Sequence, residues 1–329
     1  MYLLELAGED DRFAVAEAAS AATGVEVVAP GVATASAVVP GRLAGLALTR
    51  RTSELLGTTD ASVEAARALL EAAALDRSGS AAVRARDVRG TAGVDARRAE
   101  RELGRVLVDR GFSIDLEWPD HELRAVFAGD VCALGWLDVE GERGFGERAP
   151  TEKPFFQPGS MDPIEARAVA NIAGARPGAT ILDPMCGTGG ILVEAGLVGA
   201  RVVGFDAQPK MVRGARENLT HYLEGGDSPA FDVGLADAGR LPLRDGSVDG
   251  VVVDVPYGRQ SKVASPDLEA LVGDVLGEAR RVAGRAVAVA DRSRTAAAEE
   301  AGWRVEAVFE RPVHRSLTRY VHVLSAPTG

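Results

Sequence analysis

The spacing of apolar residues in the first half of the chain switches between two periods. Stretches with apolar residues at every second position predict strands, and stretches with apolar residues three or four positions apart predict amphipathic helices. No glycine-rich nucleotide loop follows any of them, so we expect an α+β region here. The carboxylate of Asp60 is expected to cap the second helix. The predicted elements are strands at 1–6, 25–29, 81–88, 112–116, 123–127 and 131–139, and helices at 12–22, 60–75 and 95–110.

The second half of the chain repeats one pattern, an apolar strand followed by a helix. Such alternation predicts a doubly wound, mostly parallel, Rossmann-like sheet, and ligands of that fold bind at the carboxyl ends of the strands. The fold class is therefore α/β for this half, preceded by the α+β region. The predicted strands are 180–184, 201–206, 250–254 and 285–291, with helices from Pro209, over 267–282 and up to Gly302, and a final strand pair at 305–309 and 320–324.

Between the two halves, residues 141–158 are rich in glycine, proline and charge. This composition is typical of a connecting segment. A length of 329 residues is enough for more than one domain. We therefore expect an N-terminal region at 1–145, a linker at 146–160 and a C-terminal domain at 161–329.

A glycine loop, DPMCGTGG at 183–190, follows the first strand of the C-terminal domain and opens a helix. Glycine lets the backbone turn tightly and approach a ligand closely. A dinucleotide fingerprint requires a further glycine where this chain has Leu192. The loop resembles instead the D-x-x-x-G-x-G loop of class I methyltransferases, which implies that it packs against the amino-acid end of S-adenosylmethionine. The cofactor-binding candidates in the loop are Asp183, Pro184, Cys186, Gly187 and Gly189.

An acid, Asp206, ends the next strand, followed by Ala207. At this place in a Rossmann-like fold an acid accepts hydrogen bonds from ribose hydroxyls, and a helix cap is the alternative role. The resemblance to class I methyltransferases further implies that Asp237 lies beside the adenine amino group, with Ala238 next to it. An aspartate in an ordinary polar turn is the alternative there.

The run DVPYG at 254–258 ends a buried strand and resembles the Asp/Asn-Pro-Pro-aromatic motif of amino-methyltransferases, with Val255 in place of the first proline. Each part of the motif has a physical task. The Asp254 carboxylate accepts one hydrogen of the target amino group, the Val255 carbonyl accepts the other, and Tyr257 stacks on the base. A plain Pro-Tyr-Gly turn is the alternative. The catalytic candidates are Asp254, Val255, Pro256 and Tyr257, and Asp254 is also a cofactor-binding candidate.

The chain is acidic and contains few lysines. The net charge is −11, and the only lysines are Lys153, Lys210 and Lys262. An acidic, lysine-poor composition is typical of a halophile, here expected to be a halophilic archaeon, because acidic surfaces keep proteins soluble in strong salt. An acidic chain argues against a nucleic-acid partner, but strong salt screens the bulk charge, so local basic clusters matter more than the total.

One stretch is locally basic, since residues 84–110 contain eight arginines and five acids. Arginine can contact phosphates and stack on bases, which favours an RNA-binding surface. A solvated helix face with internal ion pairs explains the same pattern equally well. The RNA-binding candidates are Arg84, Arg86, Arg89, Arg97, Arg98 and Arg101.

Membrane, metal and thiol chemistry are not expected. The sequence has no long uncharged apolar run, and its start lacks the basic and apolar regions of a signal peptide, so we expect a cytoplasmic protein. Cys132 and Cys186 are too few and too far apart for a zinc cluster or a disulfide framework. Cys186 has no paired base, so nucleophilic catalysis is not expected.

Several segments together resemble archaeal tRNA guanosine-10 N2-methyltransferases, most strongly over residues 150–325. In its N-terminal half that family carries a ferredoxin-like segment and a THUMP RNA-binding domain, whose end resembles residues 113–136 here. The resemblance implies S-adenosylmethionine as cofactor, tRNA as partner, and methylation of the guanine amino group once and then a second time. The segments that carry it are FFQPGSMDP at 155–163 with Arg167, the loop at 183–190, and residues 254–259 and 314–320.

Three alternatives stay open. The amine motif is shared with adenine-N6 and ribosomal-RNA guanine-N2 methyltransferases. A dinucleotide-dependent oxidoreductase is disfavoured by Leu192 and by the run at 254–257. A non-catalytic RNA-binding protein that retains the fold would often have lost the loop or the acid, and this sequence keeps both. No protein partner is indicated by the sequence.

Overall fold

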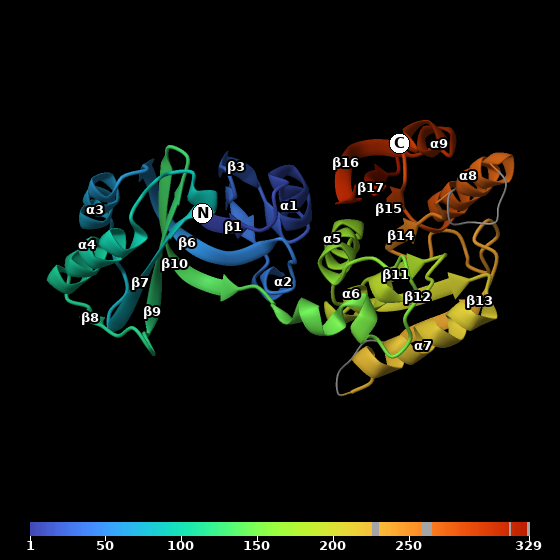
Figure 1. The fold of residues 1–329 in the computed structure, drawn as a ribbon, viewed down its shortest axis with the longest axis horizontal. Coiled ribbons are helices and arrows are strands. Elements are labelled where there is room, and N and C mark those ends of the chain that lie inside the picture. Colours follow the sequence, from blue (N-terminus) through green and yellow to red (C-terminus); the bar gives the residue numbers. More distant parts are fainter. Residues whose placement is uncertain (226–229, 258–264, 316, 328–329) are drawn as a thin grey trace. The chain divides into compact units, whose positions relative to one another are not determined.

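The computed structural model describes residues 1–225, 230–257, 265–315 and 317–327. It divides the chain into two compact units, Met1–Glu142 and Arg143–Gly329, each with its own sheet (Figure 1). No helix within the described ranges is long and apolar enough to cross a bilayer. Three residues of the predicted motifs lie outside the described residues, namely Gly258, Arg259 and Ser316.

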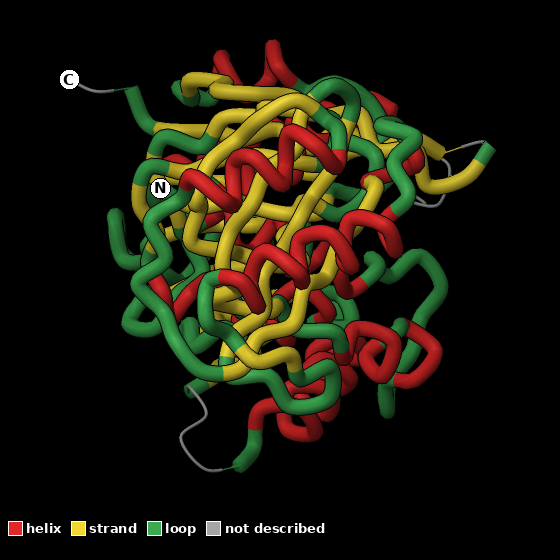
Figure 2. The backbone as a smooth tube through the Cα atoms, turned by 90° about the vertical axis from the view of Figure 1, so that its left-hand side faces the viewer, coloured by secondary structure: helices red, strands yellow, loops and turns green. Residues whose placement is uncertain are grey.

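The elements of the first unit are β1 (Tyr2–Leu6), α1 (Asp11–Ala18), β2 (Ala22–Thr23), β3 (Glu26–Ala29), β4 (Val32–Ala35), β5 (Ala37–Val38), α2 (Pro40–Leu43), β6 (Thr49–Asp60), α3 (Val63–Ala72), β7 (Ser80–Asp87), α4 (Ala96–Asp109), β8 (Ser113–Ile114), β9 (His121–Ala128) and β10 (Val131–Glu140). Its main sheet is mixed, with strand order β3-β4-β1-β6-β10-β9-β7-β8. Helices α3 and α4 lie across one face of this sheet (Figure 2), and their buried side chains pack against β7, β9 and β10. The predicted α+β character of this half is confirmed.

One predicted detail of the first unit is wrong, and one strand is missing from the prediction. Helix α3 begins after Ser62, whose hydroxyl accepts a hydrogen bond from the Ala65 N–H, and not after Asp60. Asp60 is instead the last residue of the long strand β6, where it is paired with Val131 of β10. Strand β6 was not predicted, because its residues alternate poorly between apolar and polar; its ladder partners β1 and β10 define it.

The elements of the second unit are two 3₁₀ turns (Gly144–Arg148 and Pro150–Glu152), α5 (Pro163–Ala173), β11 (Thr180–Asp183), α6 (Gly190–Leu197), β12 (Arg201–Asp206), α7 (Pro209–Leu223), β13 (Phe231–Leu235), β14 (Gly250–Asp254), α8 (Ser265–Val282), β15 (Arg285–Ala290), α9 (Thr295–Glu300), β16 (Arg304–His314) and β17 (Leu317–Ser325). They form a sheet of order β13-β12-β11-β14-β15-β17-β16. The strands from β13 to β15 are parallel, and β17 and β16 close the sheet antiparallel. The predicted doubly wound, mostly parallel sheet is confirmed.

The strand order reverses direction between β11 and β14, which lie side by side at the centre of the sheet. In open α/β sheets, ligands bind at the carboxyl ends of the strands beside such a switch point. A glycine starts β14 here because helix α5 passes very close. A Cβ on Gly250 would lie 2.1 Å from the Ala173 carbonyl oxygen, so no larger residue fits.

The stretch predicted as a linker, 146–160, falls inside the second unit. Two of its charged side chains, Arg148 and Lys153, are buried inside this unit. The Arg148 Nε donates to Glu194 Oε1 of helix α6 at 2.8 Å, and Arg167 Nη2 of helix α5 lies 2.8 Å from Glu194 Oε2. These buried ion pairs fix the segment before α5 against the helix that follows the glycine loop.

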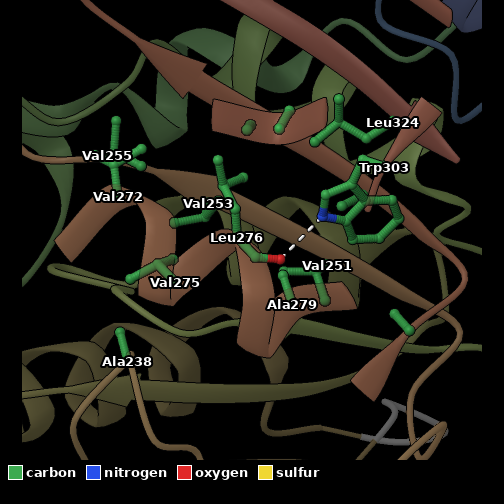
Figure 3. Packing of buried hydrophobic residues seen from close by; sticks show 14 of the residues in the cluster. Ala238, Val251, Val253, Val255, Val272, Val275, Leu276, Ala279, Trp303 and Leu324 are labelled. Carbon is green, nitrogen blue, oxygen red and sulfur yellow. Dashed lines mark hydrogen bonds between the residues drawn. The ribbon is translucent and has the colours of Figure 1, made fainter. Parts of the chain in front are cut away.

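Helix α8 packs its apolar side against β14 and β15 (Figure 3). Val251 and Val253 of β14 face Val275, Leu276 and Ala279 of α8 in this core. Trp303 closes the core, and its indole Nε1 donates to the Leu276 carbonyl at 2.9 Å. The strand that ends in Asp254 is thus held rigidly from one face.

Candidate functional site

The glycine loop between β11 and α6 is tied to the neighbouring strand. Asp183 ends β11 and is buried, and its Oδ1 accepts the Met185 N–H at 3.0 Å. The Cys186 N–H donates to the Phe205 carbonyl of β12 at 2.8 Å. Gly187 and Gly189 both have positive φ, of 51° and 76°, which only glycine adopts without strain. The loop is therefore set by local backbone geometry as well as by its contacts to β12.

Asp206, at the end of β12, connects the loop to the next helix. Its Oδ2 accepts the Gly187 N–H at 3.0 Å, and its Oδ1 accepts the Gln208 N–H at 2.8 Å. The N-cap residue of α7 is Gln208, so Asp206 is not the helix cap proper. Each oxygen of a carboxylate can accept further hydrogen bonds, so two backbone contacts leave capacity for a ligand hydroxyl.

Two cavities open beside these strand ends. The loop cavity, of about 190 Å³, is lined by Gln157, Pro158, Gly159, Ser160, Met161, Asp183, Met185, Cys186, Gly187, Thr188, Gly190, Ile191, Met211 and Asp254. The rim cavity, of about 250 Å³, is lined by Pro184, Met185, Asp206, Ala207, Gln208, Asp237, Ala238, Asp254, Pro256 and Leu271. The two cavities share Met185 and Asp254. A ligand that occupies both would pass directly over the Asp254 carboxylate.

Most predicted site residues border one of these cavities, but three do not. Gly189 packs against helix α7, because a Cβ on it would lie 3.2 Å from the Ala215 Cβ. Val255 is buried and lies in neither lining, and its N–H donates to the Val289 carbonyl at 2.9 Å. Tyr257 lines neither cavity, but its hydroxyl donates to Asp254 Oδ1 at 2.7 Å.

Sequence reasoning missed several lining residues, although a signal for some of them was present. Gln157, Ser160 and Met161 belong to the run at 155–163, which carried the family resemblance without being assigned to the cofactor site. The Ser160 hydroxyl lies 3.2 Å from the Thr188 hydroxyl of the glycine loop. The run therefore folds over the loop cavity.

The acids at the site have perturbed ionisation. Burial raises the pKa of Asp254 to about 6, while the hydrogen bond from Tyr257 and the charge of Arg319 act in the opposite direction. Burial also raises the pKa of Asp183 to about 8, and the negative charges of Asp254 and Asp206 add to this effect. A cluster of desolvated acids favours a ligand that carries positive charge.

The lining agrees with one class of cofactor. Three acids, Asp183, Asp206 and Asp237, border the two cavities together with Asp254. S-adenosylmethionine has no phosphate and carries a sulfonium and an ammonium, which negative charge favours. The acidic lining fits S-adenosylmethionine.

The thiol of Cys186 is buried and borders the loop cavity. Burial, with the charges of Asp183 and Asp206, raises the pKa of the Cys186 thiol, so it stays protonated. Within the described ranges, no three His, Cys, Asp or Glu side chains are grouped to hold a metal ion.

Comparison with known proteins places the chain in a family. Residues 150–321 match the UPF0020 family model (RMKL-like, methyltransferase domain). The chain is 38% identical over 251 residues to the tRNA (guanine(10)-N2)-dimethyltransferase of Methanothermobacter thermautotrophicus, an alignment that covers 74% of this chain and 73% of that protein. The chain belongs to the tRNA (guanine(10)-N2)-dimethyltransferase family. The family resemblance predicted from the motifs is thereby confirmed.

Two further similarities agree with this family. The tRNA (guanine(10)-N2)-dimethyltransferase of Pyrococcus abyssi is 31% identical over 237 residues, which cover 70% of each chain. The crystal structure of TrmN from Thermus thermophilus superposes with a TM-score of 0.51 at 26% identity and covers 99% of both chains. The fold match thus extends over both units, whereas the UPF0020 family model covers only the second.

The first unit contains a separate groove of about 670 Å³ beside α4, which separates the arginine candidates into two groups. Arg84, Arg97 and Arg101 line the groove, and neither Arg97 nor Arg101 makes a side-chain hydrogen bond or ion pair to another described residue. Arg84 lies 3.9 Å from Glu122 and donates to the Leu116 carbonyl at 2.6 Å. The other three candidates are also each held by an acid. Arg86 lies 3.7 Å from Glu5, Arg89 lies 2.6 Å from Asp11, and Arg98 pairs with Glu64.

The floor of the groove is apolar. Val108, Ile114 and Leu116 line it and keep 52%, 43% and 62% of their surface exposed. Glu100 also lines the groove, but its carboxylate accepts the Ala85 N–H of β7 at 3.1 Å. An exposed apolar floor beside unpaired arginines suits a nucleotide, whose base is apolar on its faces and whose phosphate is charged.

Proposed function

We propose that this chain transfers methyl groups from S-adenosylmethionine to the exocyclic N2 of guanosine 10 in tRNA, first once and then a second time. The relatives named above carry this activity in their names, and their alignments cover about 70% of this chain. The observation that carries the proposal is the position of Asp254, which ends β14 and borders both cavities. The proposed substrate is tRNA, and we propose that the protein works in the cytoplasm.

We assign the two activities to the two units. The second unit, Arg143–Gly329, contains the cavities and the motif acid, so we assign methyl transfer to it. The first unit, Met1–Glu142, contains the arginine-lined groove, so we assign tRNA binding to it, as a ferredoxin-like and THUMP region.

We propose the following placement of the cofactor. Asp183, Cys186 and Gly187 would hold its amino-acid end in the loop cavity, where the acid favours the ammonium group. Asp206, beside Ala207 and Pro184, would accept its ribose hydroxyls in the rim cavity, and Asp237 and Ala238 would hold its adenine. Asp254 and Met185, the residues that both cavities share, would then border the sulfonium.

In the proposed reaction the guanine N2 attacks the methyl carbon in line. The cofactor supplies an electrophilic methyl on a sulfonium, which is a good leaving group. Asp254 accepts one N–H of the amine, and the Val255 carbonyl accepts the other, so that the nitrogen lone pair is directed at the methyl carbon. As the N–C bond forms and the C–S bond breaks, the proton passes from N2 to Asp254. Pro256, in the rim cavity, shapes the turn, and the Tyr257 ring supports the base.

The first test of this function uses the substrate. Wild-type protein is incubated with labelled S-adenosylmethionine and either unmodified tRNA or the same transcript with adenosine in place of guanosine 10. We expect label only in the guanosine transcript. Equal labelling of both transcripts would show that the methylated atom is not N2 of guanosine 10.

The groove yields a separate prediction about tRNA binding. Replacing both Arg97 and Arg101 by alanine should weaken tRNA binding about 10-fold or more. It should also reduce the slope of log Kd against log salt by about 1.5–2, because binding releases counterions from each phosphate that is contacted, and two such contacts are removed. The measurement is a filter-binding titration at several salt concentrations.

The control is the double variant Arg67→Ala/Arg98→Ala. It removes the same charge from arginines that lie in exposed ion pairs with Glu71 and Glu64. We expect its affinity to stay close to wild type. If both double variants lose affinity equally, the groove is not the tRNA-binding surface and only net charge matters.

A further inference from the structure

A chain of hydrogen bonds runs from the last strand of the second unit to Asp254. The Arg319 Nε, on β17, donates to the Tyr257 hydroxyl at 3.0 Å. That hydroxyl donates in turn to Asp254 Oδ1 at 2.7 Å. Arg319 is buried and lines neither cavity, and its Nη2 also donates to the carbonyl oxygen of Gly159, which borders the loop cavity, at 3.5 Å. Its hydrogen-bonded connection to Asp254 runs through Tyr257.

The Arg319 guanidinium is itself held in place from a different element. Its Nη1 donates to Glu165 Oε2 of helix α5 at 2.8 Å. Glu165 is partly buried, and Arg311 Nε of β16 lies 3.8 Å from its other oxygen. A buried, planar guanidinium with an ion pair on one nitrogen and a hydroxyl on another has little freedom to rotate. The hydroxyl of Tyr257 is therefore held at a fixed point beside Asp254.

We propose that Arg319 is a positioning residue for methyl transfer, which orients the Asp254 carboxylate through the Tyr257 hydroxyl while Glu165 fixes its guanidinium. This inference rests on the proposed function, since it takes Asp254 as the acceptor of the amine hydrogen. The Tyr257 hydroxyl occupies Oδ1. Oδ2 accepts no hydrogen bond from a described residue, so it remains for the N–H of the substrate.

The same contacts control the charge of the acid. Burial favours the neutral form of Asp254, and so does the negative charge of Glu165, whereas the Tyr257 hydrogen bond and the Arg319 charge favour the carboxylate. Asp183, at the neighbouring strand end, interacts unfavourably with an ionised Asp254. Only the carboxylate accepts the amine hydrogen well. Activity therefore falls as the pH drops through the pKa of Asp254, and loss of Arg319 moves this fall to higher pH.

The test is the pH profile of kcat for Arg319→Met, Arg319→Lys and Tyr257→Phe, with saturating tRNA and S-adenosylmethionine. For Arg319→Met and Tyr257→Phe we expect the acid limb to move up by about 0.5–1 pH unit, with much of kcat recovered at high pH. Arg319→Lys, which keeps the charge, should lie between them and wild type. The affinity for S-adenosylmethionine should change little in all three.

The control is Arg294→Met, since Arg294 is a buried arginine that pairs with Glu269 and has no contact to Tyr257. It should leave the acid limb in place. An equal drop of kcat at every pH in Arg319→Met and Tyr257→Phe, with an unmoved limb, would overturn the inference. If Arg319→Met does not fold, Arg319→Lys, which changes the side chain less, decides the role of Arg319, and Tyr257→Phe, which removes one oxygen only, tests the link from the hydroxyl to Asp254. Absence of methyl transfer by the wild type would contradict the proposed function instead.

Discussion

Replacing Asp254 by alanine or asparagine is expected to reduce kcat by about 10³-fold. Both changes remove the carboxylate that accepts the amine hydrogen and its proton, and asparagine does so at constant size. The measurement is single-turnover methyl transfer to unmodified tRNA. Because ionisation of Asp254 is disfavoured by burial, its removal should not lower the Tm at neutral pH.

Calorimetric titration with S-adenosylmethionine separates this effect from loss of the cofactor. Asp254 borders both cavities, but the backbone ties of the loop involve Asp183 and Asp206 instead. We therefore expect both variants to bind the cofactor within about 10-fold of the wild-type affinity. If either variant transfers methyl groups at close to the wild-type rate, Asp254 is not required for the reaction.

The second large effect is expected at Asp206. Its carboxylate accepts the N–H groups of Gly187 and Gln208, and it borders the rim cavity. Asp206→Ala removes both loop contacts and the proposed ribose contact, and hydrogen bonds to charged groups contribute about 1.5–3 kcal/mol each. We expect the affinity for S-adenosylmethionine to fall about 100-fold or more.

Asp237→Ala is the matched comparison for this prediction. Asp237 borders the same cavity, but among the described residues its Oδ1 accepts a single N–H, that of Gly239 in its own turn. Its loss should weaken cofactor binding by about 10-fold, the value of one hydrogen bond. If both variants lose the same amount of affinity for S-adenosylmethionine, Asp206 has no special role in shaping the loop.

The second unit was predictable from sequence because its signals are local. Strands β11, β12 and β14 lie within one residue of the predicted 180–184, 201–206 and 250–254. An apolar run followed by a glycine loop or an acid marks both the strand and its carboxyl end, where the site forms. Helix α5, in contrast, was not predicted, because nearly all its residues are buried and it lacks an amphipathic pattern.

The positioning of Asp254 could not be predicted from local signals. Arg319 meets Tyr257 across 62 residues of sequence and Glu165 across 154. No motif or period relates residues so far apart, and only the sheet order brings β17 beside the strand ends. The same holds for Arg148. Its charge made the segment resemble a linker in composition, although the side chain forms a buried ion pair with Glu194.

The role of the arginine-rich stretch was partly predictable from sequence. Charge alone gave no reason to prefer Arg97 and Arg101 over Arg98. Helix geometry separates them, since residues four apart share a face and adjacent residues do not. Arg97 and Arg101 face the groove with Val108, whereas Arg98 faces Glu64 of α3. A helical projection of α4 would have found the face, but not the apolar floor contributed by Ile114 and Leu116.

Methyl transfer to guanosine 10 is tested most directly by mass spectrometry of nucleosides from unmodified tRNA incubated with this protein and S-adenosylmethionine. We expect N2-methylguanosine that later becomes N2,N2-dimethylguanosine, both mapped to position 10, the site in the names of the relatives. A methyl group on adenine or at another position would contradict the assigned target. No methylation of any nucleoside, with cofactor binding demonstrated, would contradict the proposed activity itself.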